Sequence, residues 1–453
     1  MRLSGPLLSA SAALLLVALT GPTASAAVGG HEDDVRHVEC SPGALIAAIE
    51  EANSHGGRTL SLDRNCTYDL TTAFADADGL PVITQRIHIK GNDATIQRDD
   101  APGTPLFRIF DIAGPHGDLS LNDLTIKGGN VSNPAGDTGG GILVQKGGEL
   151  RLSDSTVTGN TAQSYGGGIA NQGQASIIHC TISDNHSTRN TSTDGGGGIG
   201  NIGALRLKDS RVMSNTAGSL GGGLRQDGGT TDTDNTTLSN NSATFDGGAV
   251  FTNFGTVNLN SSVVTDNTAG GQGGGIQNFD HTKLHDTNVS GNTASQGGGI
   301  NNFNVLEIEG SRITDNTAAS RGGGVWTSQT AEIRHSTISE NSVTGVNGQG
   351  GGLWNNRGLV LDDVKVVRNK TTDANSQGGG IYNINDTGQR FSGNLQLIKT
   401  KVTDNSSGNG TSTTNAGGVW TNTQFTVFED SAISDNHPTN CKGSPITVDH
   451  CVN

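Results

Sequence analysis

The chain has 453 residues, of which 69 are glycine, and only 32% are hydrophobic and 4% aromatic. This small supply of apolar side chains argues against one large spherical core, whereas stacked repeats need less because each unit buries its face on the next. The formal net charge of −15 argues against a basic surface for phosphates, so we expect no nucleic-acid partner.

Residues 1–26 have the pattern of a secretory signal peptide. Arg2 is followed by an apolar run from Pro6 to Thr20 and by the A-x-A site Ala24-Ser25-Ala26. That run is too short to cross a bilayer and no later segment is apolar enough, so we expect no membrane span. We therefore predict a secreted protein, extracellular or loosely associated with the cell envelope, whose mature N-terminus is disordered over residues 27–37.

A short capping helix is predicted from Ser41-Pro42, because Leu45, Ile46, Ile49 and Ala52 share one face. This helix and the first irregular coils should occupy residues 38–118, and a second cap residues 437–453.

Cysteines near the two ends of the mature chain predict two local disulfides, as expected in an oxidising compartment. The predicted pairs are Cys40–Cys66 and Cys441–Cys451. The remaining cysteine, Cys180, is interpreted as a small buried hydrophobe, because adjacent His179 should point the other way along a strand.

Residues 119–436 repeat one pattern: L-x-L, then S-x-V-x-x-N, a polar loop and G-G-G-I. The alternation with period two predicts strands, while asparagine and the glycine triplet predict turns. Each repeat is expected to hold three short strands, and one coil per repeat stacks equivalent strands in parallel ~4.8 Å apart. The predicted fold is all-β, a parallel β-helix of about a dozen coils with a short N-terminal capping helix.

The asparagine of this pattern recurs eleven times, always three residues after an aliphatic one. We expect these side chains to form an internal ladder in which each amide bonds to the coils above and below. The members are Asn160, Asn185, Asn215, Asn241, Asn267, Asn292, Asn316, Asn341, Asn369, Asn405 and Asn436.

The stretch C-S-P-G-A-L-I-A-A-I-E-E-A-N, starting at Cys40, resembles the opening of secreted right-handed parallel β-helix proteins of the CSLREAI or choice-of-anchor type. It departs from that opening by the extra Pro42-Gly43-Ala44 and by Ile46-Ala47 in place of an Arg-Glu pair. The repeats are similar to the G-G-A-I and F-x-x-N units of polymorphic outer membrane proteins. The resemblance implies the right-handed, pectin-lyase-like fold over about residues 38–440, but no shared activity.

The residue that follows the aliphatic residue of each glycine triplet forms a column containing all three tryptophans. Its neighbours should point inward, so we expect Trp326, Trp354, Tyr382 and Trp420 to form an exposed strip about 15 Å long. One interpretation is a stacking ladder that supports the sheet, or a site covered by a loop. The other is a platform for sugar rings.

The familiar catalytic sets of polysaccharide-cleaving β-helix enzymes are missing from the sequence. Stacking should still bring Asp315 near Glu340 and Asp404 near Asp435, at ~5 Å. Such pairs suit Ca²⁺, a shared proton or a retaining glycosidase, or they are solvated turns with splayed carboxylates. We expect no cofactor, with Ca²⁺ at these four residues as a weak candidate.

The sequence favours a non-catalytic, monomeric protein that binds extracellular polysaccharide or cell-surface glycan through the aromatic face of its C-terminal coils. A polysaccharide lyase or glycoside hydrolase that uses the same face is one alternative. A structural, adhesin-like envelope scaffold is the other.

Overall fold

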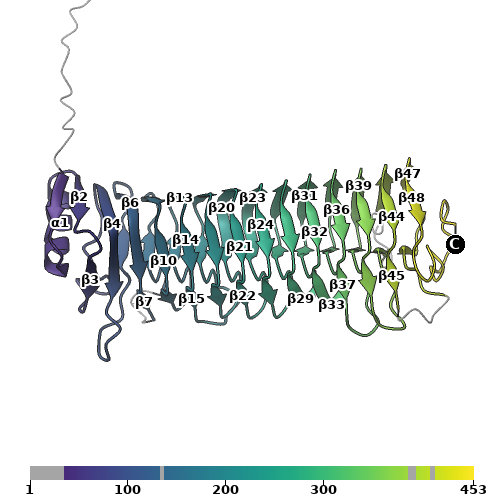
Figure 1. Cartoon of the computed structure of the whole chain (residues 1–453), viewed down its shortest axis with the longest axis horizontal. Helices are drawn as coiled ribbons and strands as arrows, with labels where there is room; N and C mark the ends of the chain where they lie inside the picture. The colour runs from purple at the N-terminus through teal and green to yellow at the C-terminus, as the bar shows by residue number, and fades with distance from the viewer. Residues whose placement is uncertain (1–34, 133–136, 386–393, 409–413, 453) are drawn as a thin grey trace, which may run out of the picture. The chain divides into compact units, whose positions relative to one another are not determined.

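The computed structural model describes residues 35–132, 137–385, 394–408 and 414–452. The predicted signal peptide over 1–26 and residues 27–34 lie outside this part of the chain. Within it, the compact unit from Val35 is a parallel β-solenoid of ~14 turns with one helix, which confirms the predicted fold class. Figure 1 shows equivalent strands of successive turns side by side. No helix among the described residues is long and apolar enough to cross a membrane.

Each regular turn contains four strands, so the prediction of three is wrong. The missed strand is the short one directly after the ladder asparagine, as in β11 (Thr161–Ala162), which pairs in parallel with its equivalents in the neighbouring turns. Its two residues are too few to show a period-two pattern. The four strands of a turn belong to four stacks that we call the triplet, leucine, valine and short files.

The triplet file follows the glycine triplets and carries the aromatic column. Its strands are β5 (Phe110–Ile112), β8 (Ile142–Val144), β12 (Ile169–Asn171), β16 (Ile199–Asn201), the first parts of β20 (Leu224–Asp234) and β23 (Val250–Asn260), β26 (Ile276–Asn278), β30 (Ile300–Asn302), β34 (Val325–Thr327), β38 (Leu353–Asn355), β42 (Ile381–Asn383) and β46 (Val419–Thr421).

The leucine file contains the L-x-L strands. These are β1 (Val35–Val38), β2 (Arg58–Leu62), the first parts of β4 (Arg86–Arg98) and β6 (Asp118–Lys127), β9 (Glu149–Ser153), β13 (Gln174–Ile178), β17 (Ala204–Lys208), the second parts of β20 and β23, β27 (His281–His285), β31 (Val305–Glu309), β35 (Ala331–Arg334), β39 (Gly358–Asp362), β43 (Asn394–Ile398) and β47 (Val427–Glu429).

The valine file precedes the ladder asparagines. It comprises β3 (Thr67–Leu70), the second parts of β4 and β6, β10 (Thr156–Thr158), β14 (Thr181–Ser183), β18 (Arg211–Met213), β21 (Thr237–Ser239), β24 (Val263–Thr265), β28 (Asn288–Ser290), β32 (Arg312–Thr314), β36 (Thr337–Ser339), β40 (Lys365–Val367), β44 (Lys401–Thr403) and β48 (Ala432–Ser434).

The short file forms a separate 11-stranded sheet. Its strands are β7 (Asn130–Val131), β11, β15 (His186–Ser187), β19 (Thr216–Ala217), β22 (Ser242–Ala243), β25 (Thr268–Ala269), β29 (Thr293–Gln296), β33 (Thr317–Arg321), β37 (Ser342–Val343), β41 (Lys370–Thr371) and β45 (Ser406–Ser407).

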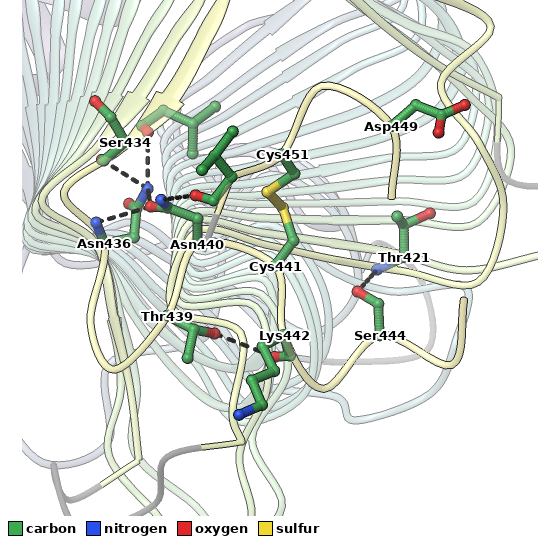
Figure 2. The surroundings of a disulfide bond; sticks show 12 residues. Thr421, Ser434, Asn436, Thr439, Asn440, Cys441, Lys442, Ser444, Asp449 and Cys451 are labelled. Atoms are coloured by element: carbon green, nitrogen blue, oxygen red, sulfur yellow. Dashed lines mark hydrogen bonds between the residues drawn. A yellow bond between two sulfur atoms is a disulfide. The ribbon is translucent and has the colours of Figure 1, made fainter. Parts of the chain in front are cut away.

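The asparagines form the predicted internal ladder. Asn267 is an example: its Oδ1 accepts hydrogen bonds from the backbone N–H and the Nδ2 of Asn241. Its own backbone N–H and Nδ2 donate in the same way to Oδ1 of Asn292. The N-terminal end of the ladder is Gly129, whose N–H donates to Asn160 Oδ1. The C-terminal end is Asn440, which the sequence analysis missed. Asn440 closes the ladder because its Oδ1 accepts from the N and Nδ2 of Asn436, as Figure 2 shows.

Both ends are capped and both predicted disulfides are present. At the N-terminus, Ser41 Oγ caps α1 (Pro42–Ser54), whose buried face contains Leu45 and Ile49. The predicted disordered segment 27–37 extends too far, because residues 35–37 belong to β1, which pairs with β2. At the C-terminus, Cys441–Cys451 closes the predicted cap (Figure 2).

Candidate functional site

The aromatic column does not form the predicted exposed strip. Trp326, Trp354 and Tyr382 are only 7%, 4% and 5% exposed, and Trp420 is partly buried. The expectation that the column lies outside the main core is correct, because these rings form a cluster of their own. The error was to equate a position outside the core with exposure.

The rings are buried because they stack on one another along the solenoid. Centroids lie 5.0 Å apart for Trp326–Trp354, 6.5 Å for Trp354–Tyr382 and 4.2 Å for Tyr382–Trp420, with interplanar angles of 3–8°. A sugar packs on the face of an aromatic ring, and in Trp354 and Tyr382 neighbouring rings of the stack occupy the faces. The indole N–H of Trp354 is also bound, to Gln349 Oε1 at 3.1 Å, and that of Trp420 to the Gly443 carbonyl at 2.9 Å. The column therefore acts as a stacking ladder, which was the other interpretation of the sequence.

The stack continues towards the N-terminus through rings that the sequence analysis missed. Phe303 lies 4.8 Å from Trp326, and Phe279 stacks on Phe303 at 4.8 Å and 9°. These phenylalanines stand two residues after the column position, so a search of that column alone does not find them. The column residues of the same two turns, Gln277 and Asn301, are fully buried, and their carboxamides have no hydrogen-bond partner among the described residues.

The four weak candidates for Ca²⁺ binding lie at equivalent turns of the solenoid. Asp315, Glu340, Asp404 and Asp435 all have positive φ, between 56° and 59°, at the turn before the ladder asparagine. Glu340 is bound by Arg368 of the next turn, with Nε 2.9 Å from Oε1. In the described part of the chain, no three His, Cys, Asp or Glu side chains are placed to hold a metal ion. The solvated-turn interpretation therefore fits these residues best.

Cys180 is a buried core residue, as predicted. Burial raises the pKa of its thiol to about 11, so the thiol stays protonated at neutral pH. The adjacent His179 is exposed and lies 3.5 Å from both Asp154 and Asp209. This thiol has neither the ionisation nor the neighbouring base that a nucleophile requires.

A buried ion cluster lies where the triplet file begins. Arg108 Nη1 is 3.3 Å from Asp111 Oδ2 and 3.5 Å from Asp78 Oδ1. Burial raises the pKa of Asp111, and raises that of Asp78 to about 6 although the charge of Arg108 acts in the opposite direction. Because Arg108 and Asp111 are each only 5% exposed, we interpret the cluster as structural.

A groove runs along the outer face of the leucine file and, at its N-terminal end, along the turns before β4, β6 and β9. It consists of three hollows with volumes of ≈ 430, ≈ 190 and ≈ 420 Å³. Glu149 lines both the first and the second, and Asp232 both the second and the third, so neighbouring hollows share a lining residue. They cover the strands from β4 to β35, about 40 Å at ~4.8 Å per turn.

From β13 to β35 the groove is lined by the middle residue of each L-x-L unit, which points outward between two buried leucine-type positions. Parallel register places these residues in one column. In order they are Ser176, Arg206, Asp232, Asn258, Lys283, Glu307 and Glu332, and Arg151 of β9 precedes them in the same register. The sequence contained this signal, but its polar residues look like an ordinary solvated face.

Comparison with known proteins assigns no family to the chain. No protein-family model and no curated protein matches it. Among solved structures, the A-module of a mannuronan C-5 epimerase from Azotobacter vinelandii is similar at 15% identity. The match covers 90% of this chain and 96% of that chain with a TM-score of 0.38. A similarity this weak carries no argument about function.

Proposed function

We propose that this protein is a secreted, non-catalytic β-solenoid that binds an extracellular or cell-surface glycan in the groove of the leucine file. The observation that carries the proposal is the row of three hollows along the leucine file, in which neighbouring hollows share a lining residue. A row of polar hollows about 40 Å long matches an extended polymer better than a compact small molecule. The two disulfides fit an extracellular location.

The chemistry of the lining suits hydroxyl-rich ligands. Ser176, Thr230 and Asn258 offer neutral donors and acceptors, and charged side chains lie between them. Arg206, on β17, is exposed and has no ion-pair partner within the described residues. Its guanidinium is therefore available to donate several hydrogen bonds to a ligand.

Binding is better supported than cleavage in this groove. Glu307 and Glu332 are register neighbours and so resemble a carboxylate pair. Partial burial raises the pKa of Glu307, but hydrogen bonds from Lys283 and His281 outweigh this and hold its pKa below the ordinary value. A general acid requires the opposite shift.

Replacing Arg206 by alanine is expected to weaken glycan retention about 10- to 100-fold, the effect of losing charge-assisted hydrogen bonds. The measurement is affinity electrophoresis in native gels that contain a panel of soluble polysaccharides. Arg312→Ala is the matched control, because Arg312 is also an exposed arginine on a strand but lies in the valine file, and it should leave retention unchanged.

Absence of retention on every polysaccharide would overturn the binding proposal, as would equal losses in Arg206→Ala and Arg312→Ala. The same glycans should yield no new reducing ends or unsaturated products after incubation with the protein. Product release that Glu307→Gln abolishes would replace binding by catalysis.

A further inference from the structure

The charged side chains of the groove pair with one another at its N-terminal end. Asp118, only 8% exposed, accepts from Arg86 Nε at 2.9 Å and from Arg151 Nη1 at 2.5 Å. Arg151 also binds Glu149 on its own strand. The two arginines and two carboxylates thus neutralise each other across three turns.

The same compensation holds at the other end of the groove. Glu307 lies 3.0 Å from Lys283 Nζ through Oε2 and 3.0 Å from His281 Nε2 through Oε1. Arg334 binds Glu332 on the same strand. In the middle, Asp232 accepts from Asn258 Nδ2 at 2.7 Å.

Within the described residues, these pairs leave Arg206 as the one lysine or arginine of the groove lining without an ion-pair partner. A polyanionic sugar chain would have to draw Lys283 away from Glu307 and Arg151 away from two carboxylates. It would also approach a chain of formal net charge −15. The hydroxyl groups of an uncharged sugar can instead bind to carboxylate lone pairs and to N–H groups that the ion pairs leave unused, so no ion pair has to break.

We infer that the ligand of the groove is an uncharged linear polysaccharide. This inference rests on the proposed glycan binding and adds the class of glycan. The paired charges act as fixed hydrogen-bond donors and acceptors, because each partner holds the other in place. Binding should therefore depend little on ionic strength, because an uncharged ligand offers no charge that salt could screen.

The test compares retention of the full chain in gels with neutral polymers (glucomannan, hydroxyethyl cellulose, xyloglucan) and with polyanions (polygalacturonate, alginate, hyaluronate). We expect retention by at least one neutral polymer, little changed between about 50 and about 500 mM NaCl, and no retention by the polyanions. Glu307→Gln should create retention on a polyanion that salt abolishes, because it releases Lys283 and His281.

The outcomes distinguish the proposed glycan site from the inferred class of glycan. Wild-type retention on polyanions but not on neutral polymers, lost in Arg206→Ala, would overturn the uncharged class and keep the groove as the glycan site. Failure of Glu307→Gln to gain polyanion retention, with the fold intact by circular dichroism, would contradict charge pairing as its cause. Absence of wild-type retention on all six polymers would remove the proposed function itself.

Discussion

Asn267→Ala is expected to lower the free energy of unfolding by about 3 kcal/mol or more, because each buried group left unpaired costs roughly 1–3 kcal/mol. The substitution removes the acceptor of the Asn241 N–H and side-chain amide, and the donor to the carbonyl of Leu238. It also leaves Asn292 Oδ1 without one of its two donors. Equilibrium denaturation in urea, followed by circular dichroism, measures the loss.

Asn304→Ala is the matched control for the ladder. Asn304 is an exposed asparagine in the same solenoid, and its substitution should change the unfolding free energy by less than about 0.5 kcal/mol. Equal effects of the two variants would contradict the structural role of the ladder. So would an Asn267→Ala protein with wild-type stability.

Trp354→Ala is expected to destabilise the protein by about 3–5 kcal/mol, the usual cost of deleting a large buried aromatic side chain. The indole is 4% exposed and stacks on Trp326 and Tyr382, and Arg321 lies over its ring at 5.4 Å from the centroid. Folded Trp354→Ala protein should keep its glycan retention, because the ring faces are not available to sugar. Thermal unfolding and affinity electrophoresis of the same preparation test both parts.

Phe254→Ala is the control for the aromatic substitution. Its ring is 62% exposed, so we expect little change in stability. Loss of retention in Trp354→Ala at wild-type stability would contradict the stacking role. That result would restore the sugar platform predicted from the sequence.

Most of the fold could be predicted because the repeat imposes strict register. A buried asparagine amide needs hydrogen-bond partners, and at this position the partners are the equivalent asparagines of the neighbouring turns. Asn160 and its ten successors therefore specify parallel stacking. The strands of the short file were missed because two residues carry no periodicity. The cap residue Asn440 was missed because it follows Asn436 by only four positions and so breaks the repeat spacing.

The candidate site was harder to predict, for two physical reasons. Alternation tells which side of a strand a residue occupies, but not what covers it, and equivalent rings such as Trp354 and Tyr382 cover one another. Hollows and ion pairs depend on side-chain conformations across three or more turns. The sequence places Lys283 and Glu307 in neighbouring repeats, but only the structure shows that they meet.

Carboxyl footprinting tests the central claim most directly. The protein is labelled with a carbodiimide and an amine, with and without a saturating neutral polysaccharide that it retains, and the modified residues are quantified by mass spectrometry. We predict protection of Glu149, Asp232 and Glu332 in the groove, and unchanged labelling of Asp315, Asp404 and Asp435 at the valine-file turns. Protection of the turn carboxylates with unchanged labelling of the groove would contradict the assignment of the leucine file as the glycan-binding face.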